Sequence, residues 1–197
     1  MKRLEPLQSS HSRSPLPDGR LGALFVDRDG VMNRRIENGY VLSWRDFEPL
    51  ALFVQAARPF VTSGIPIVVV SNQSCVGRGL IDEQSLRAIF NRMAGYFSGR
   101  GTPISAYFCC PHSPFDGCDC RKPKPGLFFA AKTSLGVDLG QSAMIGDQQT
   151  DVAAGRAAGV LSLLVDAADR RGYLAAFAQA RDFILGVGRP YAAAATA

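Results

Sequence analysis

Short apolar runs and stretches of helical spacing alternate along the chain. The apolar runs, each followed by polar or glycine residues, lie at 23–29, 65–74, 104–110, 142–147 and 159–166. Short runs rich in Val, Ile, Leu and Phe are typical of strands buried in a parallel sheet. Between them, apolar residues at helical spacing predict helices at roughly 50–63, 82–99, 125–136 and 149–158. The alternation predicts a doubly wound α/β domain with a Rossmann-like parallel sheet.

Composition limits the number of domains and the setting of the protein. A chain of 197 residues with 47% apolar and 20% charged residues is long enough for one domain with a substantial core. No apolar run reaches the ~18 residues of a membrane span, and residues 1–20 lack the apolar stretch of a secretory signal. We expect a cytoplasmic monomer without a membrane partner. Its parts would be a flexible N-terminal arm at 1–20, one domain at 21–188 and a loose tail at 189–197.

The net charge is compatible with a small anionic ligand. It amounts to +5, which would also suit nucleic acid. However, the basic residues are scattered, and no basic run with interleaved aromatic residues occurs. Attraction to a small, multiply charged anion explains the charge as well, so no nucleic-acid partner is expected.

Acidic residues follow two of the predicted strands. Asp27 and Asp29 come directly after the apolar part of the first run, and Asp147 follows the fourth run. Ligands of doubly wound domains bind at the carboxyl ends of the strands, so these side chains are expected to share one site. Two neighbouring carboxylates raise each other's pKa unless a cation lies between them, and Mg²⁺ prefers oxygen ligands of this kind. The alternative for Asp27 and Asp29 is a purely structural part in a turn or a helix cap.

Polar and basic residues at two further places suit a phosphate group. Ser71 and Asn72 follow the apolar run IVVV, where a hydroxyl and backbone N–H groups can hold phosphate oxygens; an ordinary strand-to-helix turn is the alternative. Arg121, Lys122 and Lys124 lie among prolines in CRKPKPG, which fits an anion site or a solvated charge run. Together with the aspartates, these residues form a complete set for phosphoryl transfer through an aspartyl phosphate.

The segment CPHSPFDGCDC, residues 110–120, holds three of the five cysteines and one of the two histidines. Cys110, His112, Cys118 and Cys120 offer four donors that fill a tetrahedral Zn²⁺ shell and leave no position for a reacting water. We therefore predict a structural zinc site, with reduced free thiols as the alternative. The cluster also motivates a non-enzyme alternative, a zinc-containing nucleic-acid-binding protein, but it lacks the long spacer and the helix of a zinc finger.

Four motifs follow one another along residues 23 to about 165: FVDRDGVMN, VVVSNQS, CDCRKPKPG and MIGDQQTD. In this order they resemble the four motifs of the haloacid dehalogenase (HAD) superfamily of phosphatases. DRDG with NQS, the Cys/His cluster and RKPKPG is similar to the branch of histidinol phosphatases and D-glycero-D-manno-heptose 1,7-bisphosphate phosphatases. ENGYV, NQSCVGRG and KPKPGL resemble the heptose enzymes, whereas the short gap between His112 and Cys118 is more like that of the histidinol enzymes.

The resemblance implies a HAD-like fold with a small zinc-bound loop and no large cap domain. It also implies an Mg²⁺-dependent phosphomonoesterase that removes the 7-phosphate of D-glycero-D-manno-heptose 1,7-bisphosphate. A phosphatase for histidinol phosphate or another small sugar phosphate is the alternative. In either case, the partner is a small phosphorylated metabolite.

The resemblance also assigns roles to residues. Asp27 would be the nucleophile, Asp29 the general acid and base, and Ser71 and Lys122 would stabilise the transferring phosphoryl group. The implied Mg²⁺ ligands are Asp27, the backbone carbonyl of Asp29, and Asp147. Substrate contacts are implied for Arg28, Glu37, Asn38, Gly39, Tyr40, Asn72, Gln73, Ser74 and Arg121.

Three further residues are open to more than one interpretation. Arg78 either reaches a distal phosphate of a bisphosphate or lies exposed to solvent. Asp151 is expected either to contact the metal ligands without binding the metal itself or to lie at the start of a helix. Gln148 stands where relatives often have Lys or Arg, so the local positive charge is expected to be lower.

Overall fold

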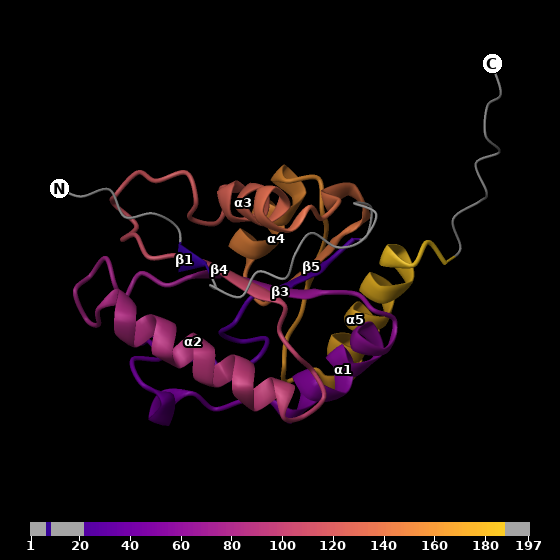
Figure 1. Ribbon diagram of the computed structural model, residues 1–197, viewed down its shortest axis with the longest axis horizontal. Helices are drawn as coiled ribbons and strands as arrows, with labels where there is room; N and C mark the ends of the chain where they lie inside the picture. Colours follow the sequence, from indigo (N-terminus) through magenta and orange to yellow (C-terminus); the bar gives the residue numbers. More distant parts are fainter. Residues whose placement is uncertain (1–6, 9–21, 188–197) are drawn as a thin grey trace, which may run out of the picture.

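The computed structural model describes residues 7–8 and 22–187 and shows a layered α/β domain (Figure 1). Its sheet has the strand order β1-β4-β3-β2-β5-β6. The strands are β1 (Leu7–Gln8), β2 (Leu24–Val26), β3 (Ile67–Asn72), β4 (Ala106–Cys110), β5 (Ala143–Gly146) and β6 (Leu161–Leu164). The five strands from β2 to β6 run parallel, which confirms the predicted doubly wound sheet.

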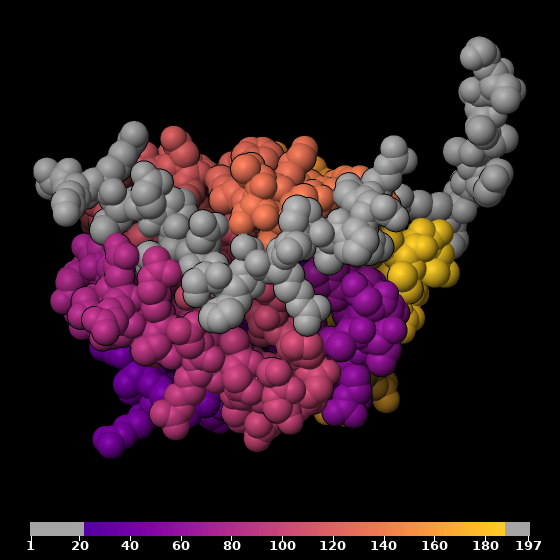
Figure 2. Space-filling model, in the orientation of Figure 1, coloured from indigo at the N-terminus to yellow at the C-terminus, as the bar shows by residue number. Residues whose placement is uncertain are grey.

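Helices cover both faces of this sheet (Figure 1). They are α1 (Ala51–Thr62), α2 (Glu83–Ser98), α3 (Gly126–Leu135), α4 (Gln149–Ala157) and α5 (Arg170–Ile184), with short 3₁₀ turns η1 (Trp44–Asp46) and η2 (Leu139–Gln141). α1, α2 and α5 lie on one face, and α3 and α4 on the other. Figure 2 shows the outer surfaces of α2, in magenta, and α3, in orange.

The two layers explain the continuous apolar runs. In β3, Val69 belongs to the core under α1, α2 and α5, whereas Val68 and Val70 belong to the core under α3 and α4. A strand with apolar packing on both faces cannot alternate between apolar and polar residues. This is why the buried strands could be predicted from short apolar runs.

Two elements go beyond the sequence prediction. The first is α5, which buries Tyr173, Phe177 and Ile184 at helical spacing against the α1 layer. The second is β1, which lies within the arm predicted at 1–20 and pairs antiparallel with β4, Leu7 opposite Cys109. The other residues of that arm, and the tail predicted at 189–197, lie outside the described residues.

The connections between strands and helices are short enough to contain no cap domain within residues 22–187. The longest strand-to-helix connection, 27–50, includes only η1 and isolated bridges. This agrees with the predicted fold without a large cap. None of the described helices is long and apolar enough to cross a membrane.

The register of the sheet positions the candidate site. Val26 of β2 lies opposite Val69 of β3 and Ile145 of β5. Since these strands are parallel, Asp27 and Asp147, which follow β2 and β5, emerge at the same edge of the sheet. Ser71 and Asn72, the last residues of β3, reach this edge as well.

Candidate active site

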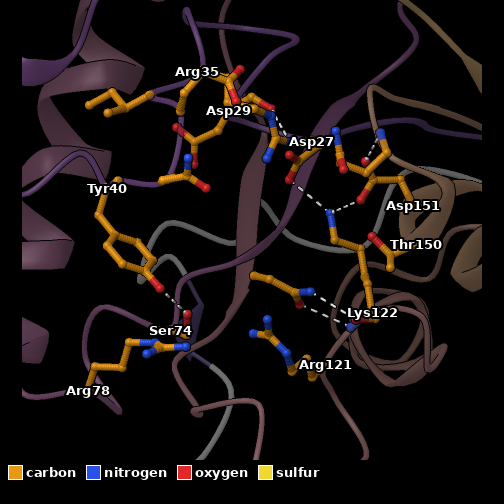
Figure 3. A pocket seen from close by; sticks show the side chains of 16 residues that line it. Asp27, Asp29, Arg35, Tyr40, Ser74, Arg78, Arg121, Lys122, Thr150 and Asp151 are labelled. Carbon is orange, nitrogen blue, oxygen red and sulfur yellow. Dashed lines mark hydrogen bonds and ion pairs between the residues drawn. The ribbon is translucent and has the colours of Figure 1, made fainter.

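A cavity of about 650 Å³ opens at the carboxyl edge of the central strands (Figure 3). Its lining includes many of the residues that the sequence singled out: Asp27, Asp29, Glu37, Asn38, Gly39, Tyr40, Asn72, Ser74, Arg121 and Lys122. They come from the ends of β2 and β3, from the loop before η1 and from the loop before α3. The topology thus gathers segments far apart in the sequence around one polar hollow.

Asp27 and Lys122 form a buried ion pair on the wall of this cavity. The Lys122 Nζ lies 2.8 Å from Asp27 Oδ1 and 2.6 Å from Asp151 Oδ1, and it donates to the Val70 carbonyl at 2.7 Å. Burial opposes the charge of Lys122, but the two carboxylates outweigh it and raise the pKa of the ammonium group. Burial, together with the charges of Asp151 and Asp29, raises the pKa of Asp27, and Lys122 offsets part of this rise. The site therefore holds a fixed positive charge beside a carboxylate.

Asn72 holds the loop that carries Lys122. Its Oδ1 accepts from the Lys122 backbone N–H at 3.0 Å, and its Nδ2 donates to the Lys122 carbonyl at 2.9 Å. This pair of hydrogen bonds joins the end of β3 to the start of the α3 loop. Asn72 was predicted to contact the substrate, and in the structure it both lines the cavity and positions the loop that carries Lys122.

Asp29 lies in a dense network of donors. Arg28 donates to both carboxylate oxygens at 2.8–3.2 Å, Asn33 to Oδ1 at 2.9 Å and Gln73 to Oδ2 at 3.0 Å. Burial alone would raise the pKa of Asp29, but the Arg28 guanidinium and these hydrogen bonds outweigh it and lower the pKa. The ionised carboxylate is thus favoured.

Arg28 and Gln73 differ from their predicted roles as substrate contacts. Neither lines the cavity: each is 1% exposed, and each side chain donates to Asp29. Arg28 also lies over the Phe90 ring, 5.3 Å from its centroid. Ser71 is likewise 1% exposed, is absent from the lining and accepts a hydrogen bond from Gln73 at 2.9 Å. These residues form a buried layer around the Asp29 carboxylate.

Three carboxylates come close enough to hold one metal ion. Asp27, Asp147 and Asp151 each offer an oxygen within 4.8 Å of the others. Burial raises the pKa of Asp147, and the charge of Asp27 adds to this effect, while hydrogen bonds from Arg35 oppose it. Asp151 also accepts from the backbone N–H of Gln148 at 3.0 Å, as expected of a residue at the start of α4. A hard divalent cation fits this set of oxygen donors.

The Cys/His cluster is a second candidate metal centre. The donor atoms of Cys110, His112, Cys118 and Cys120 lie within 4.8 Å of one another. Cys118 Sγ is 3.6 Å from both other sulfur atoms, and His112 Nδ1 is 3.4 Å from Cys110 Sγ and 3.2 Å from Cys120 Sγ. Zn–S bonds of about 2.3 Å place tetrahedral sulfur ligands about 3.8 Å apart, so the cluster is close to the size of a zinc shell. Contacts with Cys120 and His112 lower the pKa of Cys110 to about 5, which favours the thiolate that metals bind.

Some lining residues were not predicted. Arg35 binds both carboxylate oxygens of Asp147, and Thr150 reaches the cavity from the start of α4, beside Gln148, whose effect on the local charge was considered from the sequence. Arg35 lies in the loop NRRIENGY just before the predicted contacts, but nothing in its spacing indicates a partner 112 residues away. Arg78, for which two interpretations were open, lines the cavity.

Arg78 lies near one end of the site. Figure 3 shows it beside Tyr40 and Ser74, on the side away from Asp151. The Tyr40 hydroxyl and the Ser74 Oγ are 3.2 Å apart and hydrogen-bonded. This bond joins the loop before η1 to the loop after β3. The cavity thus has one end that holds the carboxylates and another rich in hydroxyl and guanidinium groups.

A parallel sheet with paired aspartates after its central strand, a buried lysine and a further aspartate after the neighbouring strand defines a phosphatase of the HAD class. Residues 119–185 match the family model described as HAD-hydrolase-like. The D-glycero-beta-D-manno-heptose-1,7-bisphosphate 7-phosphatase of Vibrio cholerae is 37% identical over 145 residues, which are 70% of this chain and 77% of that protein. The alpha-specific counterpart of Burkholderia mallei is also 37% identical, over 73% of this chain and 78% of that one.

A solved structure agrees with these relatives. The D,D-heptose 1,7-bisphosphate phosphatase of B. bronchiseptica, complexed with magnesium and phosphate, superposes with a TM-score of 0.70 and 34% identity, covering 79% of this chain and 86% of that one. The chain belongs to the family of D-glycero-D-manno-heptose-1,7-bisphosphate 7-phosphatases within the HAD superfamily. This confirms the family resemblance of the four motifs.

Proposed function

We propose that this phosphatase removes the 7-phosphate of D-glycero-D-manno-heptose 1,7-bisphosphate through an aspartyl phosphate on Asp27. The observation that carries the proposal is the pairing of Asp27 with Lys122 on the wall of a polar cavity, with 2.8 Å between Nζ and Oδ1. A carboxylate that is both buried and reachable from a cavity can attack phosphorus, while a fixed ammonium stabilises the charge of the transferring group. The heptose bisphosphate named for the relatives supports the choice of substrate.

In the first step, an oxygen of Asp27 forms a bond to phosphorus as the bond from phosphorus to the sugar oxygen breaks. For this step the Asp29 carboxyl has to take up a proton against the effect of Arg28 on its pKa, and it then gives that proton to the leaving oxygen. In the second step, water attacks the phosphorus of the aspartyl phosphate, Asp29 takes a proton from this water, and inorganic phosphate leaves. The contacts of Asp29 with Arg28 favour the ionised carboxylate, which is the form that the second step requires.

Mg²⁺ is the proposed cofactor, held by Asp27, the backbone carbonyl of Asp29, and Asp147. The closeness of Asp151 to Asp27 and Asp147 supports a site of high negative charge. When bound, the ion would offset the repulsion between these carboxylates and the substrate phosphate. The magnesium and phosphate bound to the related heptose phosphatase support this assignment.

The remaining lining residues are proposed to bind the rest of the substrate. Arg121 comes directly before Lys122, and Glu37, Asn38, Gly39 and Tyr40 line the cavity as well. Arg28, Gln73 and Ser71 would act through the carboxylates rather than on the sugar, because they are buried behind them. In this proposal the 7-phosphate binds at Asp27, and the sugar contacts the loop of residues 37–40.

A structural Zn²⁺ is proposed for Cys110, His112, Cys118 and Cys120. Four protein donors leave no open position for a reacting water. Cys120 is two residues before Lys122, so the metal would hold the loop that presents the ammonium group.

The substrate assignment is tested by comparing kcat/KM for both anomers of the heptose 1,7-bisphosphate with kcat/KM for histidinol phosphate. The position of the phosphate that remains on the sugar is read by ³¹P NMR. We expect the heptose to be preferred and the 1-phosphate to remain. A higher kcat/KM for histidinol phosphate would refute the proposal and favour the alternative that the short gap between His112 and Cys118 suggests.

A further inference from the structure

Arg35 contacts two of the three groups proposed as Mg²⁺ ligands. Its Nε donates to Asp147 Oδ2 and its Nη2 to Asp147 Oδ1, both at 2.7 Å. The same Nη2 donates to the backbone carbonyl of Asp29 at 3.3 Å. Figure 3 shows Arg35 beside Asp29, at the end of the cavity that holds the carboxylates. The Arg35 guanidinium thus binds the same oxygen atoms that a divalent cation would use as ligands.

The two cations compete for the same electron pairs. A planar guanidinium binds a carboxylate through both oxygens, and a divalent ion bound to the same group would repel it. Asp147 lies close against the backbone of Gly30, since a Cβ added at Gly30 would meet its Oδ2 at 1.9 Å. The backbone of Gly30 therefore closes one side of the carboxylate. The ammonium group of Lys122 does not pair with Asp147: it contacts Asp27 and Asp151 instead.

Arg35 has room to leave this position. Its side chain is 34% exposed, and it lines both the active-site cavity and a neighbouring cavity of about 780 Å³ that Asp147 also lines. A guanidinium displaced from Asp147 would remain at the wall of the active-site cavity. There it can pair with a phosphate group of a ligand.

We propose that Arg35 competes with the divalent cation for Asp147 and the Asp29 carbonyl, and that it pairs with the ligand's phosphate once it is displaced. The inference rests on the proposed metal-dependent function. Arg35 would thus weaken metal binding to the free enzyme, and a phosphate ligand would relieve this effect. Because coupling between two ligands is reciprocal, metal would strengthen phosphate binding by the same factor.

The test measures Mn²⁺ binding by the electron paramagnetic resonance signal of the free ion, without any turnover. Mn²⁺ accepts the oxygen ligands of Mg²⁺ sites, and the protein is first loaded with one equivalent of Zn²⁺ to fill the cysteine cluster. We expect Arg35→Gln to bind Mn²⁺ about fivefold more tightly than the wild type, the size expected of a partly exposed ion pair. Inorganic phosphate should raise Mn²⁺ affinity more in the wild type than in Arg35→Gln.

Arg34→Gln is the matched control, since Arg34 pairs with Glu48 at the surface and its side chain is 70% exposed. It should bind Mn²⁺ like the wild type. Arg35→Lys keeps the charge but loses the two-point contact, so its affinity should lie between those of the wild type and Arg35→Gln. Equal Mn²⁺ affinity of the wild type and Arg35→Gln would overturn the inference while leaving the metal site intact. Absence of Mn²⁺ binding in both would refute the metal-dependent function together with it.

Discussion

The two candidate metal centres differ in how the chain builds them. The cysteine cluster takes all four donors from residues 110–120, the last residue of β4 and the loop that follows it. The carboxylate cluster joins Asp27 to Asp147 and Asp151, more than a hundred residues away, through the parallel pairing of β2 with β5. The first is local, and the second exists only after the sheet has formed.

Their surroundings differ as well. The carboxylates are contacted by Lys122 and Arg35, and two of them, Asp27 and Asp151, line a cavity large enough for a sugar phosphate. The cysteine cluster is bonded mainly within itself, and three of its four residues are buried. Negative charge next to cations and open space suits chemistry on an anionic ligand, whereas a closed set of soft donors suits a structural role.

Replacement of the proposed nucleophile should give the largest difference between the two centres, because it abolishes activity without affecting the zinc site. Asp27→Asn keeps the shape of the side chain but removes the attacking charge, so kcat should fall by at least about a thousandfold. Zinc content, measured by elemental analysis, should not change. Retained turnover at the wild-type level would exclude Asp27 as the nucleophile.

Brief treatment with EDTA should affect the carboxylate centre first. We expect activity to drop by about a hundredfold or more and to return on addition of Mg²⁺, because a hard ion on oxygen ligands beside an open cavity exchanges readily. One equivalent of zinc should stay bound to the four-ligand cluster. Activity that persists in EDTA would contradict the Mg²⁺ dependence.

Loss of one sulfur ligand should act on both centres, but unequally. Cys118→Ser should lose its zinc and about 2 kcal/mol of stability, which lowers the melting temperature by roughly 4–8 °C. Activity should fall about ten- to a hundredfold, because the loop that presents Lys122 loses its anchor.

The matched control for this loop is Asp119→Asn. Asp119 lies between Cys118 and Cys120, its side chain is 91% exposed, and it pairs with Lys124 at the surface. This variant should keep its zinc, stability and activity. A Cys118→Ser protein that retains full zinc would rule out the proposed ligand set.

The smallest effect is expected from Gly30→Ala. Gly30 has a φ of 89°, and an added Cβ would meet Asp147 Oδ2 at 1.9 Å. We expect the strained backbone to cost about 1–2 kcal/mol of stability. We also expect weaker metal binding, so that half-maximal activity requires a roughly tenfold higher Mg²⁺ concentration. Gly64→Ala is the control, since its φ is 71° but nothing lies within 4 Å of the added Cβ. It should lose similar stability and keep the wild-type Mg²⁺ requirement. If the Mg²⁺ requirement rose equally in both variants, backbone strain rather than contact with Asp147 would be the cause.

Much of the candidate site could be predicted because its polar and charged residues occur in short sequence motifs. Asp27 with Asp29, the NQS segment, Lys122 and the four zinc donors each occur in recognisable local patterns. The helix α5 was also within reach, since Tyr173, Phe177 and Ile184 recur at helical spacing. The side-chain environment of Arg28 could not be predicted, because nothing in DRDG indicates that the arginine turns inward onto Phe90 and Asp29.

The sequence by itself determined the alternation of strands and helices, the local Cys/His cluster and the residues proposed to react, because these depend on spacing within a few residues. The tertiary structure decided which charges face one another. Arg35 reaches Asp147 across 112 positions, and Lys122 reaches Asp27 across 95. Such pairs depend on strand order and on burial, which strengthens charge interactions by excluding water. Residue spacing alone carries no information about either.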